Sequence, residues 1–186
     1  MNKIKIGIII IVNLLAFFPL EFKLSGQTTT AILNVTSGGY PVFLFNTFNE
    51  FNNGLTYNSN IKLRIRFEDL DAGNVLIPGT TWKLSVESAS PNIDGTAANF
   101  LNLNKVNLRV ENVTAGATQS AGTNVFFPLT AAYQEIANTG INGVGFNAVP
   151  EVEVVISVQV GVPPNQMAGE LPDFYIVFLD FFLEKE

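Results

Sequence analysis

The chain has 186 residues with ten basic and sixteen acidic side chains, and it contains neither histidine nor cysteine. Its length fits one domain. Without cysteine no disulfide can stabilise it, and Ser-His-Asp sites, Cys-His sites and the common zinc and copper sites are excluded. A net charge of −6 argues against nucleic acid as a partner, because phosphates need a basic surface.

Residues 1–27 have the layout of a secretory signal peptide. Lys3 and Lys5 form a short basic start, residues 7–20 form an apolar run, and small polar residues follow. The run is shorter than the roughly 20 residues that a membrane-spanning helix needs. We therefore expect cleavage next to Gln27, export to the periplasm, cell surface or medium, and no membrane span in the mature protein.

Alternating apolar and polar residues dominate residues 28–186, which we interpret as a single domain. This period-2 pattern is typical of strands with one buried and one solvated face. The clearest segments are residues 61–68, 82–87, 105–111 and 152–160, and shorter candidates are residues 31–36, 41–46 and 125–129. Turn-forming residues separate these segments. One short helix is a candidate at residues 131–137.

The C-terminal run, residues 174–183, is apolar at both parities. One parity holds Phe174, Ile176, Phe178 and Phe182, and the other holds Tyr175, Val177, Leu179, Phe181 and Leu183. A strand of this kind must be covered on both faces, and we expect it to be paired along both edges. It is closed either by the N-terminal part of its own chain or by a strand from another molecule.

About eight strands separated by turns, without helices between them, predict an all-β fold. The expected architecture is an immunoglobulin-like antiparallel β-sandwich.

A turn after the strand at residues 61–67 is a weak candidate for calcium. Asp69, Asp71 and Asn74 could supply some of the oxygen ligands that this cation takes from a short, sharply turned segment. The spacing lacks the full calcium-loop pattern and its distal glutamate. A hairpin turn is the favoured interpretation, and no cofactor is expected.

Two alternative functions follow from the side chains that remain. A monomeric carbohydrate- or ligand-binding module would need exposed aromatic residues around a site, for which Phe48, Phe51 and Tyr57 are candidates, whereas the parity of Trp82 predicts core packing. A carboxylate-dependent hydrolase would need two carboxylates across a cleft. Its candidates are Glu68, Asp69, Asp71, Asp94, Glu151 and Glu153. We do not expect an enzyme.

The C-terminal stretch resembles the closing segment of chaperone–usher pilins, including their spore-coat-U-like branch. The resemblance rests on Ala168-Gly169-Glu170, followed by Asp173 and an alternating final strand. Residues 28–36 could correspond to the pilin N-terminal segment. Residues 80–86 resemble a strand common in exported β-sandwich proteins of Bacteroidetes-type bacteria. The chain departs from many pilins in lacking both a disulfide and a near-terminal tyrosine.

The resemblance implies a secreted, non-enzymatic structural or adhesive protein of the bacterial cell surface, a pilin-like subunit of a fimbrium that assembles by β-strand addition. The strand-exchange residues would be Ala31, Leu33 and Val35 on the first strand, and Phe174, Ile176 and Phe178 on the last. The partners would be copies of the chain in a homo-polymer or other surface subunits, with a periplasmic chaperone before assembly.

Overall fold

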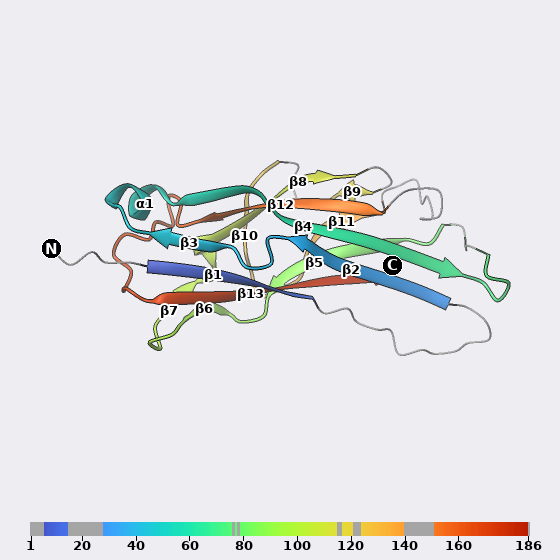
Figure 1. Ribbon diagram of the computed structural model, residues 1–186, viewed down its shortest axis with the longest axis horizontal. Helices are drawn as coiled ribbons and strands as arrows, with labels where there is room; N and C mark the ends of the chain where they lie inside the picture. The colour runs from blue at the N-terminus through green and yellow to red at the C-terminus, as the bar shows by residue number, and fades with distance from the viewer. Residues whose placement is uncertain are drawn as a thin grey trace.

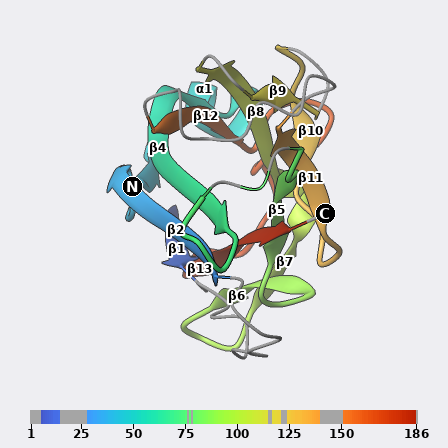
Figure 2. The ribbon, with the colours of Figure 1, turned by 90° about the vertical axis from the view of Figure 1, so that its right-hand side faces the viewer.

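The computed structural model describes residues 6–14, 28–75, 77, 79–114, 117–120, 124–139 and 151–185. These residues form two packed β-sheets, which confirms the predicted all-β sandwich (Figure 1). Figure 2 shows the sandwich from one end, with β2 and β4 in one layer and β13 and β5 in the other. Among the described residues, no helix has the length and apolar character needed to cross a membrane.

The smaller sheet has five strands, all paired antiparallel. Its order is β10 (Phe127–Pro128), β8 (Val106–Val113), β12 (Val152–Val160), β4 (Leu55–Leu70) and β2 (Thr28–Ser37). Strand β2 therefore lies at an edge and pairs with β4 along its length.

The larger sheet has eight strands. Its main order is β3 (Val42–Phe45), β1 (Ile6–Leu14), β13 (Phe174–Lys185), β5 (Trp82–Ser88), β11 (Gln134–Asn138) and β9 (Thr118–Gln119). Strand β6 (Asn92–Gly95) also pairs with β13, and β7 (Phe100–Asn102) pairs with β6. All pairs are antiparallel except that of β1 with β13, which is parallel.

The core lies between the sheets and is built from the predicted alternating positions. From the smaller sheet, alternate residues of β8 and of β4 from Ile61 onward are buried, and β12 also buries Val155 and Ser157 between its alternate positions. From the larger sheet, β5 contributes Trp82, Leu84 and Val86, all fully buried. The predicted core position of Trp82 is confirmed. Burial of these large apolar side chains supplies the main drive to fold.

The helix expected at residues 131–137 is wrong, because strand β11 covers most of this segment and pairs with β5 and β9. A six-residue helix instead occurs at α1 (Phe48–Asn53). A capping box starts it: Glu50 N donates to the Thr47 side chain, and Thr47 N donates to Glu50 Oε2 at 2.9 Å. A short 3₁₀ turn, η1 (Leu103–Lys105), precedes β8.

Candidate functional site

The candidate site is the place in the larger sheet that strand β1 fills, between β3 and β13; we call it the β1 position. Along one edge, β1 pairs parallel with β13 from Gly7↔Phe174 to Leu14↔Phe181. Along the other edge, it pairs antiparallel with β3 from Ile6↔Phe45 to Ile9↔Val42. Figure 1 shows β1 lying between these two strands. Because sheet neighbours are about 4.8 Å apart, β3 and β13 are separated by roughly twice that distance.

The strand that fills this position comes from the predicted signal peptide. Strand β1 (Ile6–Leu14) lies inside residues 1–27, while residues 1–5 and 15–27 are outside the described residues. Sequence reasoning treated the apolar run only as a leader. A signal for a strand was nevertheless present, because most residues of β1 are isoleucine or valine and β-branched residues favour strands.

Strand β13 lines one side of the β1 position with a row of buried apolar residues. Tyr175, Val177, Leu179 and Phe181 all face the core and are at most 1% exposed. The Tyr175 hydroxyl donates to the Leu171 carbonyl at 2.8 Å. Burial, with a smaller effect of nearby Asp173, raises the pKa of Tyr175, so this hydroxyl stays protonated and able to donate.

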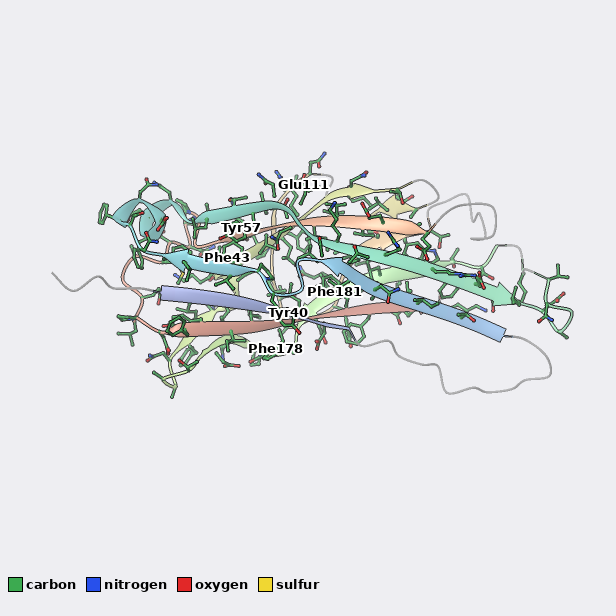
Figure 3. The ribbon with its side chains drawn as sticks, viewed as in Figure 1. Tyr40, Phe43, Tyr57, Glu111, Phe178 and Phe181 are labelled. Carbon is green, nitrogen blue, oxygen red and sulfur yellow. The ribbon has the colours of Figure 1, made fainter. Side chains whose placement is uncertain are left out.

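Strand β3 lines the other side and is held by aromatic contacts. Phe43 and Phe45 are fully buried. The Phe43 ring stacks on Tyr57 with the ring centroids 4.2 Å apart, and the Tyr57 hydroxyl donates to the Val42 carbonyl at 3.0 Å (Figure 3). Phe45 contacts Phe51 of α1 with the centroids 5.9 Å apart. Contacts with α1 and β4 therefore support β3 on the side away from β1.

One end of β13 is fixed by the buried carboxylate of Asp173. It accepts hydrogen bonds from Thr96 Oγ1 at 2.8 Å, from Asn99 Nδ2 at 3.1 Å, and from the backbone N–H groups of Ala97 and Phe174. Burial alone would raise the pKa of Asp173, but these hydrogen bonds outweigh it and hold the pKa below its ordinary value. The charged carboxylate thus ties the β6–β7 turn to the start of β13.

The other end of β13 is tied to the opposite sheet. Lys185 Nζ lies 2.6 Å from Asp69 Oδ2, and Thr80 Oγ1 donates to the same oxygen at 3.0 Å. Asp71 Oδ1 accepts from the backbone N–H groups of Gly73 and Val75, which closes a tight turn after β4.

The calcium candidates lie in this region, and one carboxylate oxygen of each aspartate has protein partners. Asp69 is committed to Lys185 and Thr80, and Asp71 to its own turn, where Asn74 adopts a φ of +60°. Among the described residues, no group of three or more acidic side chains is placed to hold a metal ion. Backbone hydrogen bonds from Asp71 N to Val75 O at 2.8 Å and from Ile77 N to Asp69 O at 2.9 Å close a tight turn at this place.

The predicted strand-exchange residues of β13 lie on its outer face and not toward the core. Phe174 is 57% exposed, and Ile176 and Phe178 are half-buried. In register they stand opposite Gly7, Ile9 and Ile11 of β1, so they still border the β1 position. The sequence held one signal for the inward parity that was not used, because Asp180 interrupts the parity of Phe174 and Phe178 and no charged residue interrupts the other between residues 174 and 183.

The predicted exchange residues of the first strand lie in β2, at the edge of the smaller sheet. Ala31, Leu33 and Val35 stand opposite Phe67, Ile65 and Leu63 of β4 in their own chain. Leu33 is buried in the core. The structure therefore uses residues 28–36 as an intramolecular strand, and exchange of this segment with another molecule stays a prediction.

Among the candidate residues of the two alternative functions, two aromatic rings pack against β3 and several carboxylates are in ion pairs. Phe48 is 86% exposed, but Phe51 packs on Phe45 and Tyr57 stacks on Phe43. Several of the candidate carboxylates form ion pairs, as Glu68 does with Arg66 at 2.6 Å and Glu151 with Arg64 at 3.2 Å.

Neither a protein-family model nor a curated protein matches this chain. The geometry of β1, β3 and β13 therefore carries the functional argument.

Proposed function

We propose that this chain is an exported, non-enzymatic subunit of a bacterial surface polymer, and that it assembles by β-strand addition in the manner of a pilin. One observation carries the proposal: the strand between β3 and β13 comes from a segment that has the layout of a signal peptide. When that segment is removed, the two strands lose their shared neighbour. A strand from another molecule then completes the sheet.

Once β1 has been removed, the chemistry of the β1 position favours binding of a peptide strand over binding of a small ligand. Its long sides are the backbone edges of β3 and β13, which present unpaired N–H and C=O groups once β1 has left. The core-facing residues of these two strands are apolar and buried, among them Phe43, Val177 and Leu179. An extended segment with alternate apolar residues satisfies both features, since its backbone completes the ladder and its side chains fill the core.

The same features explain why partners are needed. Open strand edges beside exposed apolar side chains are prone to aggregation. We therefore infer that a periplasmic chaperone covers the β1 position until assembly, and that a further copy of the chain or another surface subunit covers it afterwards. Each large apolar side chain that such a strand buries contributes about 1.5–3 kcal/mol to binding. The contact between the incoming strand and the β1 position is therefore long-lived.

The test is the mass of the mature protein taken from the cell surface, on a denaturing gel with and without boiling. N-terminal sequencing first establishes that β1 has been removed. The proposal predicts a ladder of multiples in the unboiled lane that collapses to one band on boiling. A single monomer band in both lanes would contradict it.

A further inference from the structure

We propose that residues 6–14 are a built-in occupant of the β1 position, so that the uncut chain completes its own sheet and cannot accept a strand from another molecule. Cleavage after β1 then opens the position. This inference rests on the proposed function and names the regulation of the same site: proteolysis of the chain's own N-terminal segment.

The residues of β1 match their neighbours along the whole register. Ile8, Ile10 and Val12 stand opposite Tyr175, Val177 and Leu179, the buried row of β13. Gly7, the smallest residue of β1, stands opposite two large residues, Leu44 on β3 and Phe174 on β13. Three apolar residues of β1 therefore pair in register with three buried residues of β13.

The single polar residue of β1 strengthens this match. Asn13 stands opposite Asp180, a buried carboxylate on the outer-face parity of β13. A slip by one residue would move Asn13 to Leu179 and exchange the two faces of β1. On the β5 side, Asp180 stands opposite Glu87. An uncharged polar residue, Asn13, on the β1 side therefore avoids placing a third carboxylate beside these two. A leader selected only for apolar character has no need of this match.

The expected cleavage position separates β1 from the rest of the sandwich. Strand β2 begins at Thr28, directly after Gln27, and pairs with β4 from Thr28↔Leu70 onward. A cut at this point releases β1 while the body of the protein keeps its other strands. The cut changes the occupancy of the β1 position and little else.

Covalent attachment explains why the uncut chain is closed. A tethered strand has an effective concentration in the millimolar range, which a free strand at micromolar concentration cannot match. After cleavage, this advantage is lost and an incoming strand competes on equal terms. Strand addition therefore depends on cleavage of the N-terminal segment, and not on the affinity of the incoming strand alone.

The test uses the full chain, produced with the leader retained and with a specific protease site inserted between Gln27 and Thr28. The probe is a fluorescent peptide of residues 6–14 flanked by lysines for solubility. We expect the probe to bind after cleavage, in a 1:1 ratio and with release of the fragment 1–27, and to bind at least about a hundredfold more weakly before it. Equal binding to both forms, or binding to neither, would overturn the inference.

Matched peptide variants separate a registered strand from apolar adsorption, and they avoid any effect on folding of the protein. Ile10→Asp places a charge opposite buried Val177, whereas Ile9→Asp places it opposite half-buried Ile176. We expect Ile10→Asp to abolish binding and Ile9→Asp to retain part of it. Asn13→Asp should weaken binding roughly tenfold through repulsion by Asp180, and Asn13→Lys should not weaken it. Equal effects of all four variants would overturn the inference.

An unboiled gel of the same samples distinguishes failure of this inference from failure of the proposed function. A ladder from the cut chain without probe exchange would overturn the built-in occupant and leave strand-linked assembly standing. Register-selective probe exchange without a ladder would support the built-in occupant and count against the polymer.

Discussion

At the scale of single residues, Asp173 has a clear electrostatic role. Its carboxylate is buried and accepts hydrogen bonds that lower its pKa from 3.8. A carboxylate whose pKa is lower in the folded state stabilises the fold above its unfolded pKa, and this contribution disappears as the pH falls through the folded pKa. The start of β13 should therefore weaken in acid.

We predict that Asp173→Asn lowers the free energy of unfolding near neutral pH and that the difference from the wild type shrinks as the pH falls below 3.8. Urea denaturation of both proteins over a series of pH values from about 7 into acid measures this. A difference that stays constant until the wild type itself unfolds in acid would contradict this role of the charge.

Gly95 faces Asp173 at close range. A Cβ atom at this position would lie 2.3 Å from Asp173 Oδ2 and 2.8 Å from the Asn99 carbonyl. We predict that Gly95→Ala lowers the free energy of unfolding by about 1–3 kcal/mol, because the turn and the carboxylate must shift. Gly39→Ala is the matched control, since its Cβ would meet only Val35 Cγ1 at 3.9 Å. Equal melting temperatures of the two variants would contradict this account.

At the scale of elements, the amphipathic strands could be predicted from their period-2 alternation. Strand β4 shows this, because Ile61, Leu63, Ile65 and Phe67 are buried as expected. Strand β11 could not be predicted in this way. Its pairing with β5 shifts between Glu135 and Ala137, and the adjacent Ile136 and Ala137 are both buried. The shift interrupts the alternation, and the segment then looks helical.

Helix α1 shows the opposite case: the sequence carries a local helix-start signal, although several residues of the helix have low helix propensity. Three of its six residues are asparagine, which is a poor helix former. The capping box of Thr47 and Glu50 offsets this at the first turn.

We predict that Thr47→Ala lowers the free energy of unfolding by about 1 kcal/mol, as measured by urea denaturation. Thr118→Ala, at an exposed position of β9, should have a smaller effect. The reverse order would argue against the cap.

The two faces of β13 give a further prediction at this scale. Phe181 is fully buried in the core, while Phe178 lies half-buried on the outer face (Figure 3). Phe181→Ala should lower the free energy of unfolding by about 3–5 kcal/mol, because it leaves a cavity between the sheets. Phe178→Ala makes the same change in side-chain volume and should cost clearly less. Thermal unfolding of both variants measures the difference, and equal losses would contradict the assigned parity.

At the scale of the whole molecule, the need for strand neighbours on both sides of β13 could be predicted, but the identity of one neighbour could not. The C-terminal run is apolar at both parities, and that property led to the expectation of pairing along both edges, with β5 and β6 on one side and β1 on the other. The apolar run of residues 7–20 satisfies the requirements of a signal peptide and of a buried strand alike. Only the fold places residues 6–14 between β3 and β13.

The central claim is that another molecule supplies the strand beside β13 in the mature protein. A photo-crosslinking amino acid placed at Phe178 tests it directly, because Phe178 stands opposite Ile11 of β1 in register and its outer-face position spares the core. Phe182 is the matched control, since it lies on the same face of β13 beyond the last β1 pair and stands opposite Ser85 of β5. Irradiation of mature protein on the cell surface should yield crosslinked species above the monomer mass from position 178 and not from position 182. Monomer alone from position 178, with residues 1–27 removed, would contradict the claim.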